Sequence, residues 1–200
     1  MNLPTLLTLF RIAMGPTIAG LILWASQVTF SDRTLAAQLY VASLFVFGLA
    51  AASDWLDGWL ARKLGMVTRL GAALDHSADK VLITCVLVAL AYADLPMPLV
   101  VAAIIILGRD VAVAGVREAL GARGEALPVS SLGKWKAVVE MAGVGAFLAF
   151  QASVLYNSSA DLVHSLNRAA QVLLWTAAAL ALVSGADYAA KLVSRGGRTQ

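Results

Sequence analysis

The sequence predicts an all-α, polytopic integral membrane protein with six transmembrane helices, and three observations support this fold class. Of the 200 residues, 60% are hydrophobic and only 14% are charged. The mean hydropathy of +0.80 lies far outside the range of soluble domains. The apolar residues gather in long runs, and the gaps between the runs are too short for an extramembrane domain. We therefore expect a single membrane-embedded domain over residues 1–200.

Six apolar stretches divide the chain, and each is near or above the roughly 20 residues that a spanning helix requires. Arg11 interrupts the start of the first stretch, which is also too long for the apolar part of a signal peptide. Residues 2–10 are expected to form a short N-terminal interfacial segment before the first span. The third stretch is the shortest, and Asp94-Leu95-Pro96 closes it before the fourth begins. The stretches cover about residues 5–28, 34–61, 78–94, 97–119, 133–155 and 168–190.

The basic residues predict how these spans are oriented. Twelve of the fifteen Lys and Arg residues fall at the N-terminus, in the 2–3 and 4–5 loops, and in the C-terminal tail. The opposite ends hold only Arg33 and Arg168, and Arg109 lies within the fourth span. Positively charged loops stay in the cytoplasm, so both termini and the 2–3 loop are expected on the cytoplasmic side of the inner (plasma) membrane. The twelve are Arg11, Arg62, Lys63, Arg69, Lys80, Arg117, Arg123, Lys134, Lys136, Lys191, Arg195 and Arg198.

Composition also limits the possible partners. The net charge of +3 and the pI near 9.2 are explained by membrane topology, so we expect no nucleic-acid partner. The single cysteine, Cys85, excludes an intrachain disulfide framework and lies in an apolar run, where it is expected to be a small packed side chain.

Four aspartates at fixed spacing are the most informative feature of this apolar chain. They follow the pattern Asp54-x2-Asp57-Gly58-x2-Ala61-Arg62-x8-Gly71-x3-Asp75-x3-Asp79. A charged group near the middle of a bilayer costs about 2.5–3.5 kcal/mol on insertion scales, and four acids also repel one another. Hard carboxylate oxygens suit Mg²⁺ or Mn²⁺, so the array predicts a metal site formed by Asp54, Asp57, Asp75 and Asp79.

Helical spacing indicates how the four carboxylates would meet. Asp54 and Asp57 are about 60° apart around the second helix, and Asp75 and Asp79 are about 40° apart on the third. A loop over residues 62–74 would make the two helices antiparallel. Two such pairs can bind two metal ions about 3.5–4 Å apart, which is an arrangement used for phosphoryl chemistry.

Other residues in the motif have a functional and a structural interpretation. Gly58 and Gly71 would let a substrate approach the backbone, although small residues also serve close helix packing in membranes. Arg62 would neutralise a pyrophosphate, although it also fits a cytoplasmic loop.

A second set of charges lies on the later helices. Arg109 and Arg117 are about 80° apart around the fourth helix, so both can border one cavity. An arginine here can simply pair with an acid such as Asp110. Lys134 and Lys136 begin the fifth helix at the same level, after a Ser130-Ser131 start whose amides could receive a phosphate. Together these basic residues predict a phosphate pocket beside the metals. Glu140, which is isolated in an apolar helix, fits either an interhelical contact or a pocket wall.

The aspartate array matches, position for position, the motif D-x2-D-G-x2-A-R-x8-G-x3-D-x3-D of the CDP-alcohol phosphatidyltransferase family, which this chain therefore resembles. Eight specified positions over residues 54–79 make a specific signal. The opening segment NLPTLLTLFR (residues 2–11), the GRD and VRE blocks at 108–110 and 116–118, and PVSSLGKWK (residues 128–136) look like segments of its bacterial phosphatidylglycerophosphate synthases.

The resemblance implies a six-helix homodimer with a cytoplasm-facing site that uses divalent metals, Mg²⁺ or Mn²⁺, with two ions expected. It implies that Asp54, Asp57, Asp75 and Asp79 bind metal and that Asp79 is also the catalytic base. By the same resemblance, Arg109, Arg117 and Lys134 hold the phosphate of the acceptor. The CDP group would be held by Gly58, Ala61, Arg62 and Gly71.

Two positions depart from the family pattern. The family usually has D-P-x-A-D-K between its third and fourth aspartates, whereas His76 follows Asp75 here. Losing this proline is expected to loosen the start of the third helix without removing a ligand. Asp110 stands where the synthases commonly have glutamate, and related cardiolipin synthases also have aspartate there.

The resemblance implies transfer of the phosphatidyl group from CDP-diacylglycerol to sn-glycerol 3-phosphate, giving phosphatidylglycerol phosphate and CMP. Two alternatives keep the chemistry and change the acceptor to phosphatidylglycerol, giving cardiolipin, or to inositol phosphate. A third alternative is a divalent-cation transporter, because intramembrane carboxylates also mark ion pathways. The acids gather at one edge of the bundle and no matching polar row follows, which argues against transport.

Overall fold

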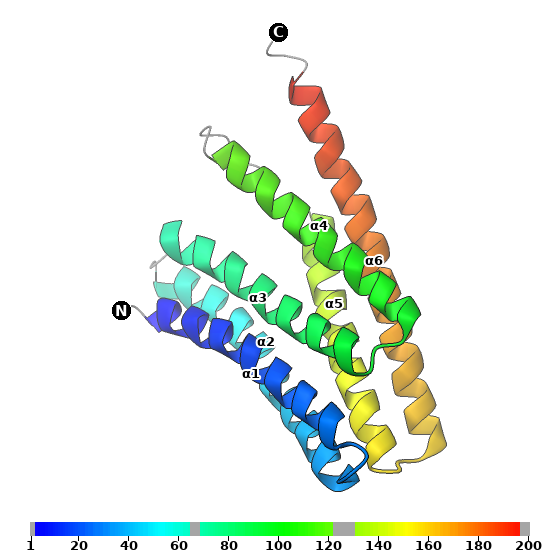
Figure 1. Ribbon diagram of the computed structural model, residues 1–200. Helices are drawn as coiled ribbons and strands as arrows, with labels where there is room; N and C mark the ends of the chain where they lie inside the picture. The colour runs from blue at the N-terminus through cyan, green and yellow to red at the C-terminus, as the bar shows by residue number, and fades with distance from the viewer. Residues whose placement is uncertain (1–2, 65–68, 122–130, 197–200) are drawn as a thin grey trace. The chain divides into compact units, whose positions relative to one another are not determined.

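Six helices account for the regular structure of the described residues. The computed structural model describes residues 3–64, 69–121 and 131–196, without the side chains of residues 3–7, 54–76, 131 and 191–196. The helices follow one another along the chain in Figure 1. They are α1 (Leu3–Val28), α2 (Arg33–Leu64), α3 (Arg69–Ala93), α4 (Met97–Gly121), α5 (Ser131–Leu155) and α6 (Ala160–Gly196).

The helices have the length and apolar character that a membrane requires. Five contain stretches able to span a bilayer within the described residues, and α3 carries no charged side chain over residues 81–93. Large apolar side chains such as Phe45 and Ile104 are exposed on the helices, as lipid-facing residues are. The all-α, six-helix membrane architecture is therefore confirmed. The five stretches are Thr8–Val28, Arg33–Ser53, Met97–Gly121, Leu132–Leu155 and Ala160–Ala190.

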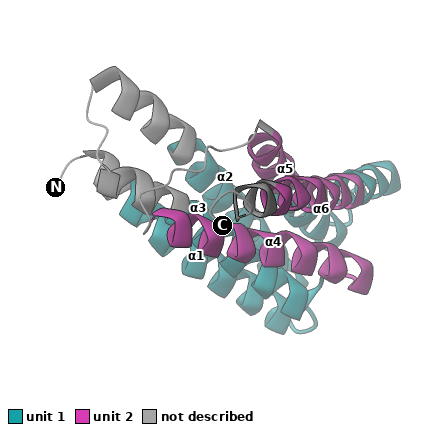
Figure 2. Ribbon diagram, turned by 90° about the horizontal axis from the view of Figure 1, so that it is seen from above, with its two compact units in different colours: residues 1–95, 144–170 teal, residues 96–143, 171–200 magenta. Residues whose placement is uncertain are grey.

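The chain forms two compact units, which Figure 2 distinguishes by colour. The first unit contains α1, α2 and α3 with residues 144–170, which include the end of α5 and the start of α6. The second contains α4, the start of α5 and the later part of α6, within residues 96–143 and 171–200. The expectation of one domain over residues 1–200 stays a prediction.

In the first unit, α1 packs against both α2 and α3. Ile18 and Ile22 of α1 and Leu82 and Leu87 of α3 are fully buried, and they are spaced as one face of each helix requires. Arg11 is also fully buried. It therefore belongs to the core of this unit.

Local sequence explains where several helices begin and end. Asp32 caps α2, because its Oδ1 accepts a hydrogen bond of 2.9 Å from the amide of Leu35. At the end of α5, the amide of Ser158 donates to the carbonyl of Ser153 (3.0 Å), and Asn157 has a positive φ of 52°. This is the hydrogen-bonded turn that often terminates helices, with Asn in the left-handed position.

Arg33 completes this turn from the start of α2. Its Nη2 donates to the carbonyl of Val154 (2.7 Å) and to Oδ1 of Asn157 (2.8 Å), and its Nε donates to the carbonyl of Leu155 (2.9 Å). The guanidinium thus satisfies carbonyls that a helix end leaves without intrahelical partners. Arg33 lies at the opposite ends of the spans from most basic residues, and its role there is therefore structural.

The helices extend beyond the apolar stretches. Helix α3 begins at Arg69, before the stretch at 78 and before Asp75, which was expected to open the helix, and α6 begins at Ala160, before the stretch at 168. The expected loop over residues 62–74 is helical up to Leu64 and from Arg69 onward. The physical reason is that hydropathy marks the segment that lies in lipid, whereas helix hydrogen bonding continues through polar sequence with good helix formers. His76 therefore lies inside α3 and not at its start. Helix α1 runs through residues 3–10, whose interfacial position stays a prediction.

Close packing of α1 on α3 gives a testable prediction at Gly15. A Cβ at this position would lie 3.2 Å from Cα of Leu82 and 3.3 Å from the carbonyl oxygen of Val81. Both are backbone atoms, so Gly15→Ala requires the helices to separate and should destabilise the fold by about 1–3 kcal/mol. Gly20 of the same helix has open space around it, so Gly20→Ala should be neutral or stabilise by up to about 1 kcal/mol. Unfolding of the purified variants in detergent would measure both effects, and equal effects would contradict this packing.

Candidate active site

The aspartate motif occupies the end of α2 and the beginning of α3. Asp54 and Asp57 lie in the last part of α2, and Asp75 and Asp79 lie in the first part of α3. Of these four aspartates, only Asp79 has a side chain that the structure describes. This residue is partly exposed, while its Oδ1 is shielded from solvent. The side chains of Asp54, Asp57 and Asp75 lie outside the described residues.

The predicted CDP-binding residues are helical in their backbone. Gly58, Ala61 and Arg62 belong to α2, and Gly71 belongs to α3. Their side chains lie outside the described residues, so their contact with CDP stays a prediction. Among the side chains that the structure describes, no three His, Cys, Asp or Glu residues are grouped closely enough to hold a metal. Three of the four aspartates predicted to bind metal have side chains outside the described residues, so the metal site stays a prediction.

The second unit contains a buried chain of ion pairs between α4 and α5. The Nζ of Lys136 lies 2.6 Å from Oδ2 of Asp110 and 2.7 Å from Oε2 of Glu140. Both Lys136 and Glu140 expose only 3% of their side chains. Removing charges from water costs several kcal/mol each, and close opposite charges offset that cost. Lys136 therefore compensates two carboxylates within the bundle.

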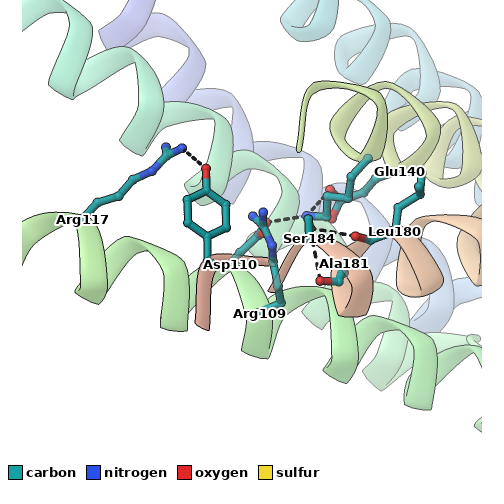
Figure 3. A network of polar contacts seen from close by, with 9 residues as sticks. Arg109, Asp110, Arg117, Glu140, Leu180, Ala181 and Ser184 are labelled. Carbon is teal, nitrogen blue, oxygen red and sulfur yellow. Dashed lines mark hydrogen bonds and ion pairs between the residues drawn. The ribbon is translucent and has the colours of Figure 1, made fainter. Parts of the chain in front are cut away.

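Arg109 extends this chain of ion pairs toward α6. Its Nη1 lies 3.1 Å from Oδ1 of Asp110, so Asp110 bridges Arg109 and Lys136. The pairing of Arg109 with Asp110 that the sequence offered as the structural interpretation is thus present. Figure 3 shows Arg109, Asp110 and Glu140 close together beside Ser184. The Ser184 hydroxyl donates to the carbonyl of Leu180 (2.7 Å) within α6 itself.

Tyr188 of α6 brings the two arginines of α4 together. The Tyr188 hydroxyl accepts a hydrogen bond of 2.6 Å from Nη2 of Arg117. The Cζ atoms of Arg109 and Arg117 each lie 5.5 Å from the centroid of the Tyr188 ring. A cation this close to an aromatic face gains about 0.5–2 kcal/mol. Arg109 and Arg117, two of the three residues predicted to bind the acceptor, therefore lie close to one buried tyrosine.

The third predicted acceptor-binding residue is placed differently. Lys134 is exposed at the start of α5, and no ion pair joins it to another described residue. Lys136 follows it by two residues, which is about 200° around a helix, and is the buried member of the two. The role of Lys134 toward the acceptor stays a prediction.

Sequence reasoning placed Lys136 in a phosphate pocket without predicting its ion pairs, left Glu140 undecided and missed Tyr188. A signal for the first was available, because Lys136 and Glu140 are four residues apart on an otherwise apolar helix, where opposite charges pair. Tyr188 carried no comparable signal. Its importance depends on the packing of α6 beside α4, which spacing along one helix does not specify.

A groove of about 470 Å³ runs between α4 and α6 within the second unit. Arg109 and Tyr188 line it, and the other described lining residues are aliphatic or glycine. Gly108 and Ala112 on α4 and Gly185 and Ala186 on α6 keep the groove open with small side chains. Arg109 and Tyr188 therefore border an accessible space.

Comparison with known proteins identifies the family. The family model for CDP-alcohol phosphatidyltransferase matches residues 1–183. The chain belongs to the CDP-alcohol phosphatidyltransferase family. This membership agrees with the six helices, five of them with candidate membrane spans within the described residues, and with the spacing of the four aspartates.

Relatives within the family cover nearly the whole chain. A CDP-diacylglycerol–glycerol-3-phosphate 3-phosphatidyltransferase of Bacillus subtilis is 36% identical over 194 residues, which cover 95% of this chain and 94% of the relative. A protein of the same name from Rickettsia bellii is 34% identical over 94% of this chain and 93% of its own length. A CMP-forming cardiolipin synthase of Oryza sativa is 32% identical over 96% of this chain and 57% of its own length.

The Lys136 ion pairs lead to a prediction about stability. Lys136→Met leaves Asp110 and Glu140 without their shared cation and should destabilise the protein by about 3–5 kcal/mol. The double substitution Lys136→Met/Glu140→Gln removes one charge of each sign, so it should be clearly more stable than Lys136→Met alone. Thermal or denaturant unfolding in detergent measures the difference.

Lys134→Met is the matched control, because Lys134 is exposed on the same helix. Its free energy of unfolding should stay within about 0.5 kcal/mol of the wild type. If Lys136→Met were as mild as Lys134→Met, or if the double variant were less stable than the single one, the buried ion pairs would not stabilise the unit.

Proposed function

We propose that this protein transfers the phosphatidyl group of CDP-diacylglycerol to sn-glycerol 3-phosphate, forming phosphatidylglycerol phosphate and releasing CMP for phospholipid biosynthesis. The observation that carries the proposal is the eight-position aspartate motif, in a chain that aligns with nearly the full length of relatives named for this reaction. The diacyl tails would remain in lipid while the head groups react at the membrane surface, so the enzyme needs no large soluble domain.

The proposed metal ligands are Asp54, Asp57, Asp75 and Asp79. The family uses divalent metal ions, and we propose Mg²⁺ or Mn²⁺, with two ions bound. Four carboxylates supply the hard oxygen donors that these ions prefer, and Asp79 presents a carboxylate with one shielded oxygen. When bound, such ions neutralise the pyrophosphate and the departing CMP.

The protein's own residues would bind the substrates and move the proton. Gly58, Ala61, Arg62 and Gly71 would hold the CDP group. Asp79 would accept the proton of the acceptor hydroxyl. The hydroxyl oxygen forms a bond to the β-phosphorus as the bond from that phosphorus to the bridging oxygen breaks, and CMP leaves with the electron pair.

Arg109, Arg117 and Lys134 would hold the phosphate of the acceptor. Both arginines lie close to Tyr188, and Arg109 also lines a groove. Guanidinium groups match phosphate oxygens in charge and geometry. Lys134 is exposed at the start of α5, where a flexible ammonium can reach a bound anion. Three basic groups favour an acceptor that carries a phosphate of its own.

We further propose a homodimer in the inner (plasma) membrane, with both termini and the active site facing the cytoplasm. The asymmetric distribution of Lys and Arg supports this orientation. A second candidate function, with phosphatidylglycerol as acceptor and cardiolipin as product, is favoured by the similarity to the rice cardiolipin synthase and by Asp110.

An acceptor panel tests the proposed function. Purified protein in lipid nanodiscs would receive labelled CDP-diacylglycerol with glycerol 3-phosphate, phosphatidylglycerol or inositol phosphate in turn. We expect CMP release and a phosphatidylglycerol phosphate product with glycerol 3-phosphate only. Chelation should abolish turnover, and Mg²⁺ or Mn²⁺ should restore it. Turnover with phosphatidylglycerol and none with glycerol 3-phosphate would replace the proposed acceptor.

Asp79→Asn tests the proposed base. Because asparagine cannot accept the hydroxyl proton and is a weaker metal ligand, kcat should fall by at least about 100-fold. Asp161→Asn is the control, since Asp161 is exposed in the first turn of α6 and should leave kcat unchanged. Full activity of a folded Asp79→Asn variant would remove Asp79 from the reaction.

A further inference from the structure

We propose that Tyr188 is the positioning residue that joins Arg109 and Arg117 into one binding site for a phosphomonoester dianion. This inference deepens the proposed function and rests on it, because it assigns the recognition of the acceptor's phosphate to a contact between α4 and α6. Tyr188 is a positioning residue here, since it acts through the arginines.

The geometry around Tyr188 is specific. The residue is 3% exposed, so its ring is held in place by the surrounding helices. Its hydroxyl binds Arg117, and its ring centroid lies at the same distance of 5.5 Å from both guanidinium carbons. The two cations are therefore within twice that distance of each other, although like charges in a bundle repel. The aromatic ring attracts both and fixes their separation.

Arg109 keeps hydrogen-bonding capacity for a ligand. Its Nη1 binds Asp110, while its Nε is buried and donates to no other residue of the part that the structure describes. A buried donor of this kind carries a desolvation cost unless something accepts its hydrogen bond. Arg109 and Tyr188 also line the 470 Å³ groove, which leaves space beside them. A phosphate oxygen is negatively charged and could accept the hydrogen bond that the Nε of Arg109 does not make to any described residue.

The carboxylates of the cluster do not cancel this site. Asp110 and Glu140 both contact Lys136, so the ammonium charge of Lys136 is used within the bundle. Arg109 contacts the carboxylate of Asp110, and the Tyr188 hydroxyl accepts a hydrogen bond from Arg117. Two guanidinium groups that lie close to one aromatic ring are a suitable receptor for a doubly charged phosphate monoester.

The test uses full-length protein in nanodiscs with Tyr188→Phe and Tyr188→Leu. Phenylalanine keeps the ring and loses the hydrogen bond to Arg117, so the KM for glycerol 3-phosphate should rise about threefold. Leucine also loses the ring, so the KM should rise about tenfold or more. The KM for CDP-diacylglycerol should change by less than about twofold, since no contact to that substrate is assigned to Tyr188.

A binding measurement separates this inference from the proposed function. Inorganic phosphate, titrated calorimetrically without CDP-diacylglycerol, should bind the Tyr188 variants more weakly in the same order. This readout holds even if the wild-type protein turns over another acceptor, in which case only the proposed function fails. Tyr92→Phe and Tyr92→Leu are matched controls, because Tyr92 is exposed on α3 in the other unit.

The outcomes are distinct. Weaker phosphate binding and a higher KM for glycerol 3-phosphate in folded Tyr188 variants, but not in the Tyr92 variants, support the inference. A lower melting temperature with unchanged phosphate affinity and KM shows a purely structural tyrosine and overturns it. If Tyr188→Leu fails to fold, Tyr188→Phe decides, because it preserves the packing of the ring.

Discussion

The ammonium group of Lys136 contacts two carboxylates from two helices, and the packing of the second unit depends on this interaction. Asp110 comes from α4, whereas Lys136 and Glu140 come from α5. In an apolar bundle these charges are tolerable only when they remain together, since each alone would have to lose its hydration without compensation. The contact consequently fixes the rotation of α5 toward α4, because turning α5 by one residue would carry Lys136 away from Asp110.

The same contact has a consequence for Arg109. Asp110 contacts Lys136 with one oxygen and Arg109 with the other. Because Lys136 fixes the position of the Asp110 carboxylate, that carboxylate also fixes the position of Arg109. A long side chain normally loses rotamer freedom when it binds a ligand, and this loss weakens binding. An arginine that is already tethered has less freedom to lose. The buried ion pairs thus contribute to a preorganised site even though Lys136 itself contacts only the two carboxylates among the described residues.

The sequence predicted the membrane architecture because composition and hydropathy report directly on the solvent that each segment occupies. It placed Arg109 and Arg117 on one side of the fourth helix, and both lie close to Tyr188, because spacing along a single helix determines which side chains share a face. It misplaced the starts of α3 and α6, since helix hydrogen bonds do not stop where lipid stops.

The sequence could not predict which of two nearby residues on opposite sides of one helix is buried. Lys134 and Lys136 are equally basic and two positions apart, and only the packing of α5 decides that the second is buried. Tyr188 shows the same limit more strongly, because its role arises from the approach of α6 to α4 through small residues such as Gly185. A Cβ at Gly185 would lie 3.4 Å from Cγ of Arg109, so this helix passes directly beside the arginine's stem.

The electrostatics of the cluster bear on which acceptor the enzyme can select. A phosphate monoester brings two negative charges and several strong acceptor atoms, whereas the phosphodiester of phosphatidylglycerol brings one charge and two ester substituents. Arg109 has a buried Nε with no acceptor among the described groups, and Arg117 lies close to the same tyrosine. If both guanidinium groups bind one ligand, as proposed, a small dianion suits them better than a diester, which brings less charge and more bulk. The closeness of two arginines on one ring therefore favours the monoester by electrostatic attraction and by size, which is the basis on which this family member would distinguish glycerol 3-phosphate from a lipid acceptor.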